Sequence, residues 1–267
     1  KHVPMMERYP CEAIITNVLG TKVLVDLAIE YDVEMFIMVS TDKAVNPTNI
    51  MGATKRIAEI YVQSCAADQK KNKSHTKFVT TRFGNVLGSN GSVIPLFRRQ
   101  IEKGGPITVT DPEITRYFMT IPEACRLVLE ASVIGKSGYI YVFDMGQPVR
   151  IYDLAKKMIE LAGLVPEKDI EIQFSGLRKL YEELLNDSEI REQTSHKKIM
   201  MAKVREYHFQ DILPQIEQLI LVAQTNDKYK LVRQMKVLVP EFISNNSEFE
   251  QLDQNNIDTT SNSQIWV

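Results

Sequence analysis

The sequence predicts an α/β protein, with a doubly wound, Rossmann-like parallel sheet and a smaller mixed α/β lobe. Short apolar strands alternate with amphipathic helices between residues 11 and 102, as in a parallel sheet with crossover helices. A polar turn follows the first of these strands, and open α/β sheets bind ligands at such strand ends. The 267 residues suffice for one large domain or for one domain with an appendage.

The elements of the larger unit follow from hydrophobic periodicity. Residues 11–31 carry apolar side chains at helical spacing, and we expect one packed face that includes Val23, Leu24 and Leu27. The apolar run 35–39 predicts a buried strand, and the next elements are a helix at 50–67, a strand at 78–83 and a helix at 93–102. The loop 84–92 is rich in residues that tolerate tight turns, which is typical of binding clefts.

After Gly104 the pattern changes to short β-like segments and helices. Strands are predicted at 107–110, 139–143 and 170–174, and helices at 121–134, 151–162 and 180–185, with two more helices filling 211–239. We therefore divide the chain into residues 1–104, a smaller lobe with a helical extension at 105–240, and a mostly flexible tail at 241–267 that is rich in Asn, Ser, Gln and Asp.

Composition excludes several classes of protein. A net charge of −2 without a basic cluster argues against nucleic-acid binding. The three cysteines, Cys11, Cys65 and Cys125, are far apart in apolar helical contexts, which favours buried free thiols in a reducing compartment. No Cys or His spacing indicates a metal site, and no apolar run reaches membrane-spanning length. We expect a cytoplasmic protein without a membrane segment in this chain.

The stretch 39–55 is where we expect the chemistry. Thr41 supplies a hydroxyl, Asp42 a carboxylate and Lys43 an ammonium, while the spacing Met51-x-x-x-Lys55 puts both side chains on one helix face. Together these groups can hold and deprotonate a polyhydroxylated ligand.

A purely structural interpretation of the same stretch is equally consistent with the spacing. Asp42 or Asn49 would then cap a helix, Lys43 would be solvated, and Pro47 would mark the helix entry.

The residues of several motifs resemble those of a known family. Residues 39–47 (VSTDKAVNP) and 51–56 (MGATKR) strongly resemble the extended short-chain dehydrogenase/reductase superfamily. More narrowly, they resemble the nucleotide-sugar 4,6-dehydratases of polysaccharide biosynthesis that act on UDP-N-acetylglucosamine. The likeness continues through RFGNVLGS at 82–89, TDP at 110–112, TRYF at 115–118, GLR at 176–178 and the tail at 240–253, and so spans nearly the whole chain.

The resemblance implies a tightly bound NAD or NADP and a UDP-sugar substrate. The sugar would be oxidised at C4, would lose water across C5 and C6, and would be reduced at C6 by the same hydride. By position, Thr41 would hydrogen-bond the C4 hydroxyl, Asp42 would be the acid for the leaving C6 hydroxyl, and Lys43 would assist removal of the C5 proton.

The resemblance also assigns binding residues. Lys55 would bind the nicotinamide ribose, and Ser40 and Asn17 would lie on the cofactor side. Residues 1–104 would be the carboxy-terminal part of the NAD(P)-binding domain, and 105–240 mainly the substrate-binding lobe. On the substrate side, Asn85 would lie near the diphosphate together with Ser89, while the diphosphate charge would be neutralised by Arg116 and Arg178.

The sequence departs from the superfamily at Met51. Most members have a tyrosine there, whose phenolate removes the hydroxyl proton, and a thioether cannot do this. Either Asp42 or a water takes the proton, or the protein is inactive. A subgroup of large membrane-anchored dehydratases resembles this chain in carrying Met, and that subgroup is associated with retention of configuration at C5.

Two further departures concern binding. No G-x-G-x-x-G turn, which seats the cofactor pyrophosphate, occurs in the sequence, and the Pro-Gly-Glu that relatives carry after the equivalent of Arg178 is absent. We expect the half with the Gly-rich turn, and any inner-membrane anchor, to precede Lys1, so that this chain alone binds the dinucleotide poorly. A homo-oligomer is expected through helices that flank the active site. The alternatives are an epimerase or reductase of the same superfamily, and a non-catalytic UDP-sugar-binding module.

Overall fold

The computed structural model describes residues 2–72, 75–176, 190–203, 205–245 and 247–253. Its centre is a five-stranded sheet in the order β1-β2-β7-β11-β10. The first three of these strands are parallel, and β11 and β10 follow them in antiparallel pairing. The strands are β1 (Met35–Thr41), β2 (Lys77–Phe83), β7 (Ile140–Phe143), β11 (Ile199–Lys203) and β10 (Ile190–Gln193).

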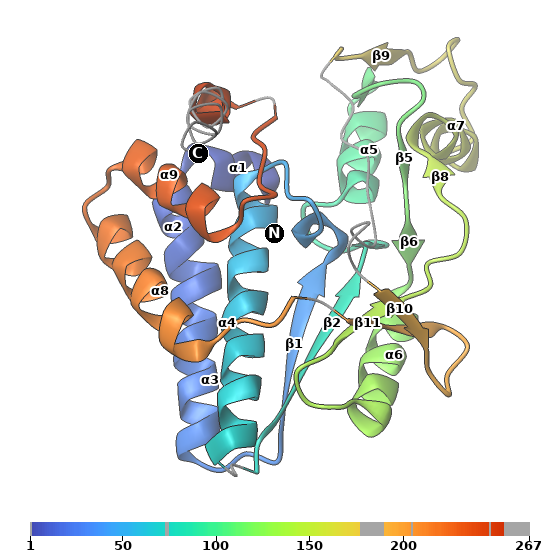
Figure 1. Ribbon diagram of the computed structural model, residues 1–267. Coiled ribbons are helices and arrows are strands. Elements are labelled where there is room, and N and C mark those ends of the chain that lie inside the picture. The colour runs from blue at the N-terminus through green and yellow to red at the C-terminus, as the bar shows by residue number, and fades with distance from the viewer. Residues whose placement is uncertain (1, 73–74, 177–189, 204, 246, 254–267) are drawn as a thin grey trace, which may run out of the picture.

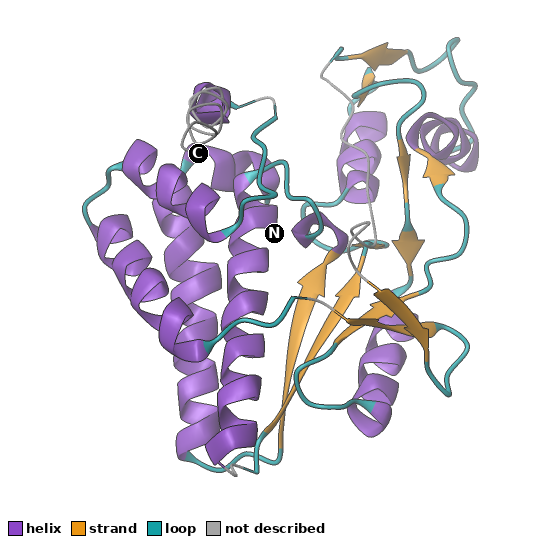
Figure 2. Cartoon of the chain, in the orientation of Figure 1, coloured by secondary structure: helices purple, strands orange, loops and turns teal. Residues whose placement is uncertain are grey.

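Helices cover both faces of this sheet, as Figures 1 and 2 show. Successive residues of a strand point to opposite faces, so Phe78 joins the core beneath the larger group of helices while Val79 joins the core beneath α6. The expected doubly wound α/β class is therefore confirmed. The larger group comprises α1 (Val3–Arg8), α2 (Pro10–Ile14), the π-helical turn η1 (Ile15–Leu19), α3 (Gly20–Glu30), α4 (Ile50–Asn72), α8 (Phe209–Gln224) and α9 (Lys228–Leu238), and the opposite face carries α6 (Ile121–Ile134).

A second cluster of elements has its own small core around Phe97, Ile107 and Ile159. Its strands form two-stranded pairs: β4 (Ile107–Val109) with β9 (Ile172–Phe174), β5 (Thr115–Arg116) with β8 (Val149–Arg150), and β3 (Asn85–Val86) with β6 (Phe118–Met119). The helices α5 (Val93–Glu102) and α7 (Ile151–Leu161) pack against these strands. The elements of residues 105–240 do not form one separate lobe. Strands β7 and β11 join the main sheet, and helices α8 and α9 pack on α2 and α4.

Strand β1 is not fully buried, contrary to the prediction. Val39 is 47% exposed, because β1 lies at the edge of the sheet and pairs on one side only, with β2, within the described residues. The strand also continues two residues beyond the predicted end, so Ser40 and Thr41 belong to it.

The first long helix differs in its buried face. Val23, Leu24 and Leu27 are 47%, 59% and 42% exposed, whereas Val25 and Ala28 are buried. The π-helical turn η1 inserts an extra residue into the helix and rotates everything after it, so the periodicity before the turn does not predict the face after it.

The prediction of a mostly flexible tail at 241–267 is wrong for the first half of this range. Phe242, Phe249 and Leu252 are buried in the main core, and the 3-10 turn η3 (Glu248–Glu250) lies in this segment. Its backbone also bonds the turn before α4, because the amide of Ile243 donates to the carbonyl of Pro47. Residues 254–267 lie outside the described residues.

Two smaller expectations concern the cysteines and the oligomer. Cys11 and Cys65 are buried free thiols as predicted, but Cys125 is exposed, on the side of α6 that lines an open hollow beside β1. The expected homo-oligomer stays a prediction: α8 and α9 pack across α2 and α4 in one continuous core, whereas α3 keeps Val23, Leu24 and Leu27 exposed. Within the described ranges, no helix combines the length and apolar character needed to cross a bilayer.

Candidate active site

The predicted reactive stretch forms a tight link between β1 and α4. The strand ends at Thr41, and the 3-10 turn η2 (Asp42–Ala44) follows it. The Thr41 hydroxyl caps this turn by accepting from the backbone amide of Lys43 at 3.4 Å. Helix α4 begins after Pro47, and the side chain of Asn49 accepts from the amide of Gly52 at 2.9 Å. Asn49 is thus the cap that the structural interpretation anticipated.

Asp42 is the centre of a polar cluster. Its carboxylate is buried, and Oδ1 accepts from the Thr41 hydroxyl at 2.6 Å and from Lys43 Nζ at 3.0 Å. The Lys43 ammonium also contacts Oδ2 at 3.3 Å and donates to Asn85 Oδ1 at 3.4 Å. Oδ1 also accepts from the backbone amide of Lys43 at 3.0 Å, so Asp42 bonds its own turn as well as the Lys43 ammonium, which is paired rather than simply solvated. The cluster unites a hydroxyl, a carboxylate, an ammonium and an amide at the carboxyl end of the parallel strands.

Lys55 lies beside this cluster on the first turns of α4. Its Nζ donates to the carbonyl oxygen of Val39 at 2.7 Å, which places the ammonium against the end of β1. Burial lowers the pKa of Lys55, and the negative charge of Glu59 partly opposes this effect. Met51, one turn before Lys55, is 5% exposed and offers no proton-transfer group.

The substrate-side predictions fall around Asn85. Its amide group donates to the carbonyl of Tyr117 at 3.2 Å, so Asn85 connects Lys43 to the segment between β5 and β6. Arg116 is the neighbouring residue, and its Nη1 donates to the Thr115 carbonyl at 2.8 Å. Ser89 lies in the turn after β3, and Arg178 lies outside the described residues. The diphosphate role of these residues stays a prediction.

The two remaining residues predicted on the cofactor side, Ser40 and Asn17, lie against other side chains. Ser40 is buried, with its hydroxyl near the Glu59 carboxylate. Asn17 lies in the π-helical turn η1, where its amide donates to Thr54 Oγ1 on α4 at 2.9 Å. Their assignment to the cofactor also stays a prediction.

Two features of the site were not anticipated from sequence. Gly52 allows α4 to approach η2 closely, because a Cβ at this position would lie 2.0 Å from the Lys43 carbonyl oxygen. A buried network of two arginines and two glutamates lies behind the reactive turn, formed by Arg56, Glu59, Arg82 and Glu241. The one sequence signal for this network was a charged Arg82 inside an otherwise buried strand.

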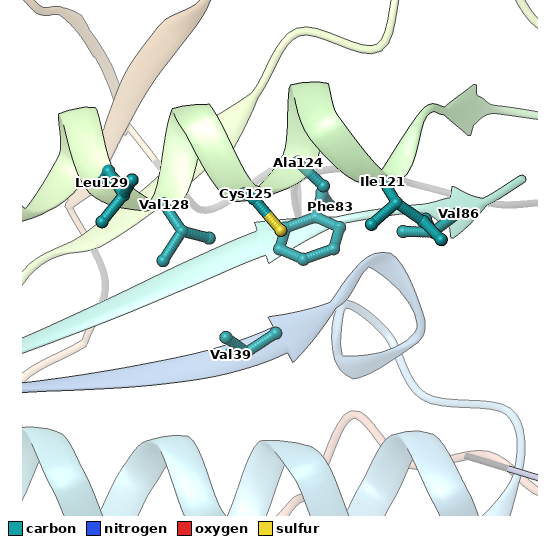
Figure 3. Close-up of a pocket in the computed structure, with 8 residues that line it drawn as sticks. All are labelled: Val39, Phe83, Val86, Ile121, Ala124, Cys125, Val128 and Leu129. Atoms are coloured by element: carbon teal, nitrogen blue, oxygen red, sulfur yellow. The ribbon is translucent and has the colours of Figure 1, made fainter.

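An apolar hollow of about 470 Å³ lies on the α6 side of the open edge of β1. Figure 3 shows Val39 on β1 facing side chains from α6 across it. Its lining residues are apolar or cysteine, which suits a packing surface better than a site for the polar atoms of a sugar. They are Val39, Phe83, Val86, Ile121, Ala124, Cys125, Val128 and Leu129.

Comparison with known sequences gives a consistent set of relatives. A family model described as "polysaccharide biosynthesis protein" matches residues 1–204. The chain is 60% identical over 210 residues to the capsular polysaccharide biosynthesis protein CapD of Staphylococcus aureus, covering 78% of this chain and 34% of the relative. It is 38% identical over 193 residues to a UDP-glucose 4-epimerase of Rickettsia canadensis, covering 71% and 54% of the two chains. The chain thus spans about a third of the length of CapD.

Comparison with solved structures agrees on the fold. Pen from Bacillus thuringiensis aligns with a TM-score of 0.68 at 33% identity, over 82% of this chain and 72% of that one. The dTDP-glucose 4,6-dehydratase DesIV from Streptomyces venezuelae, solved with NAD and TYD bound, aligns with a TM-score of 0.58 at 21% identity, over 65% and 58% of the chains. From its sequence match and its fold, the chain belongs to the polysaccharide biosynthesis protein family of extended short-chain dehydrogenases/reductases.

Proposed function

We propose that this chain carries the reaction site of an NAD(P)-dependent nucleotide-sugar 4,6-dehydratase that acts on UDP-N-acetylglucosamine. The observation that carries this proposal is the buried Asp42 carboxylate, which is shared between the Thr41 hydroxyl and the Lys43 ammonium. An acid–base pair of this kind is what an elimination requires, in addition to the proton transfer that accompanies oxidation of an alcohol.

The contacts support the following roles. Thr41 binds the C4 hydroxyl, and the adjacent Asp42 accepts its proton, since Met51 cannot. The positive charge of Lys43 assists loss of the C5 proton to water, and Asp42 returns its proton to the hydroxyl that leaves C6, so that water departs and a C5–C6 double bond forms. C5 regains a proton from water when hydride is delivered to C6. Asn85 holds the Lys43 ammonium in place during these transfers. A bound nicotinamide supplies the hydride acceptor for C4 and the hydride donor for C6.

The fit of the chain to a nicotinamide dinucleotide is partial. Lys55, with its ammonium at the carboxyl end of β1, suits the ribose beside the nicotinamide. The sequence contains no G-x-G-x-x-G turn for the pyrophosphate. Helices α3 and α4 lie on the same face of the sheet, and α4 joins β1 to β2 in a parallel crossover. A right-handed crossover through α3 would come from a parallel strand at the open edge of β1. We therefore propose that firm dinucleotide binding requires further α/β polypeptide along this edge.

The test uses a polypeptide that contains this chain together with a dinucleotide-binding half. Incubation with UDP-N-acetylglucosamine in deuterated water is expected to give a 4-keto-6-deoxy sugar that carries deuterium at C5. Unchanged substrate in the presence of bound cofactor would contradict the proposal. Asp42→Asn is the matched control, because it keeps the shape of the side chain and removes its acid–base function.

A second candidate function is 4-epimerisation, which the Rickettsia relatives named UDP-glucose 4-epimerase favour. An epimerase oxidises and reduces C4 only, so it has no need of Asp42 or Lys43 and would leave C5 unlabelled. A non-catalytic sugar-nucleotide-binding module would instead show affinity for the UDP-sugar by calorimetry and no turnover when the dinucleotide half is supplied.

A further inference from the structure

A buried carboxylate one helical turn after Lys55 is the feature that the proposed reaction does not use. Both the Glu59 and Arg82 side chains are fully buried, and the guanidinium of Arg82 grips the carboxylate through Nε at 2.8 Å and Nη2 at 2.6 Å. Arg56 contacts the same carboxylate through Nη1 at 3.2 Å, and its Nε reaches Glu241 at 3.1 Å. The network therefore joins α4, β2 and the carboxyl-terminal segment.

Burying such a network costs free energy of desolvation, so we expect it to fix the geometry of the elements that it joins. Removing charges from water is compensated only where the hydrogen bonds are well formed, and a forked guanidinium–carboxylate pair meets this condition. Burial raises the pKa of the Glu59 carboxyl, but the charges of Arg82 and Arg56 outweigh burial and leave that pKa below its ordinary value. Glu59 on α4 is thus a negative charge held against β2 by Arg82.

The pair also determines where Lys55 lies. Lys55 and Glu59 are four residues apart on α4 and share one face of the helix. When two parallel hydrogen bonds attach Glu59 to β2, α4 can neither slide nor rotate against the sheet. Lys55 then meets the Val39 carbonyl at the end of the neighbouring strand, at 2.7 Å.

We propose that Glu59 is a positioning residue for Lys55, holding the ammonium at the end of β1 through the pair with Arg82 and keeping it protonated by its charge. The catalytic meaning of this role rests on the proposed function, whereas the role itself does not. Among the charged groups around Lys55, Asp42 and Lys43 lie on η2, Arg82 lies on β2, and Arg56 and Glu59 lie on its own helix, α4.

The test measures the protonation of Lys55 directly and needs no turnover. The lysines of the purified chain are labelled by reductive methylation with a carbon-13 reagent, and the Lys55 signal is assigned by its loss in Lys55→Arg. In Glu59→Gln the pKa of Lys55 is expected to fall by about one unit, the lower end of the effect of a nearby opposite charge. Glu241→Gln is the matched control, because it removes a carboxylate from the far side of Arg56 and should leave the pKa of Lys55 unchanged.

Two results would overturn the proposal: no change of the Lys55 pKa in Glu59→Gln, or an equal fall in Glu241→Gln. If Glu59→Gln does not fold, the double variant Glu59→Gln with Arg82→Met removes both buried charges together, which proteins commonly tolerate. A smaller fall in the same direction is expected there, because removal of the Arg82 charge partly offsets the loss of Glu59, and no fall would overturn the proposal. A confirmed shift in a polypeptide that shows no dehydratase activity would support this inference and refute the proposed function, so the two failures are distinguishable.

Discussion

Gly52 lies where the first turn of α4 meets the reactive turn η2, and Gly52→Ala probes that contact with one added carbon. The new Cβ would lie 2.0 Å from the Lys43 carbonyl oxygen, 3.0 Å from the Lys43 carbonyl carbon and 3.2 Å from Pro47 Cβ. Two of these atoms belong to the backbone, so no side-chain rotation relieves the clash. Since nonbonded contacts below about 3 Å are not sustained, α4 and η2 must separate by about 1 Å.

The magnitude follows from two opposing effects. Overpacking a well-packed site costs roughly 1–3 kcal/mol, and a clash between backbone atoms belongs at the upper end of that range. Alanine in place of glycine inside a helix recovers about 1 kcal/mol. We therefore expect Gly52→Ala to lower the free energy of unfolding by about 2 kcal/mol. In an active polypeptide, a shift of about 1 Å at Lys43 should also lower kcat about a hundredfold.

Gly20→Ala is the matched control for this prediction. Gly20 is likewise helical, but a Cβ there would meet only the Ile15 carbonyl oxygen, at an ordinary 3.8 Å. Only the propensity gain remains, so the free energy of unfolding should rise by up to about 1 kcal/mol. Urea denaturation followed by circular dichroism measures both variants. A Gly52→Ala chain as stable as the unmutated chain would refute the close approach of α4 to η2.

Further predictions concern chemistry, binding and the thiols. In an active polypeptide, Asp42→Asn should lower kcat by about 10²–10⁴ with an unchanged circular dichroism spectrum, and an unaffected kcat would remove Asp42 from the mechanism. Arg116→Ala should raise KM for the UDP-sugar while kcat changes little; an unaltered KM would contradict its diphosphate role. A thiol reagent at pH 8 should react rapidly with the exposed Cys125, and Cys125→Ser should abolish this rapid reaction. Burial raises the pKa of the Cys65 thiol to about 12 from an ordinary 9.0, so the stabilisation from its neutral form is complete below pH 9 and is lost between pH 9 and 12. Denaturation curves should show this loss as a slope of about 1.4 kcal/mol per pH unit that Cys65→Ala removes.

Local patterns predicted the elements well. The helices at 93–102 and 121–134 have the expected bounds, because their periodicity and flanking turns are contained within a few residues. The association of Thr41, Asp42 and Lys43 was also predictable, since adjacent residues at the end of a strand share one turn. Periodicity failed in the helix that contains η1, where one extra residue changes the face without any obvious sequence signal.

Long-range partners were not predictable in this way. Glu59 and Arg82 are 23 residues apart, and Arg56 and Glu241 are 185 residues apart, so no spacing rule connects them. The exposure of Val39 likewise depends on β1 pairing with β2 alone among the described residues, which residues 35–39 by themselves could not reveal.

By itself, the sequence determined the α/β class, the order of its elements and the reactive turn between β1 and α4, because these depend on short-range periodicity and on the chemistry of consecutive residues. Only the tertiary structure decided what surrounds that turn: Asn85 on the Lys43 ammonium, the backbone contact beneath Gly52, the packed segment 241–253 and the buried grip of Arg82 on Glu59. These contacts join segments far apart along the chain. They form only when burial of a common core brings the segments together, since core formation supplies the free energy that compensates for burying charged and polar groups.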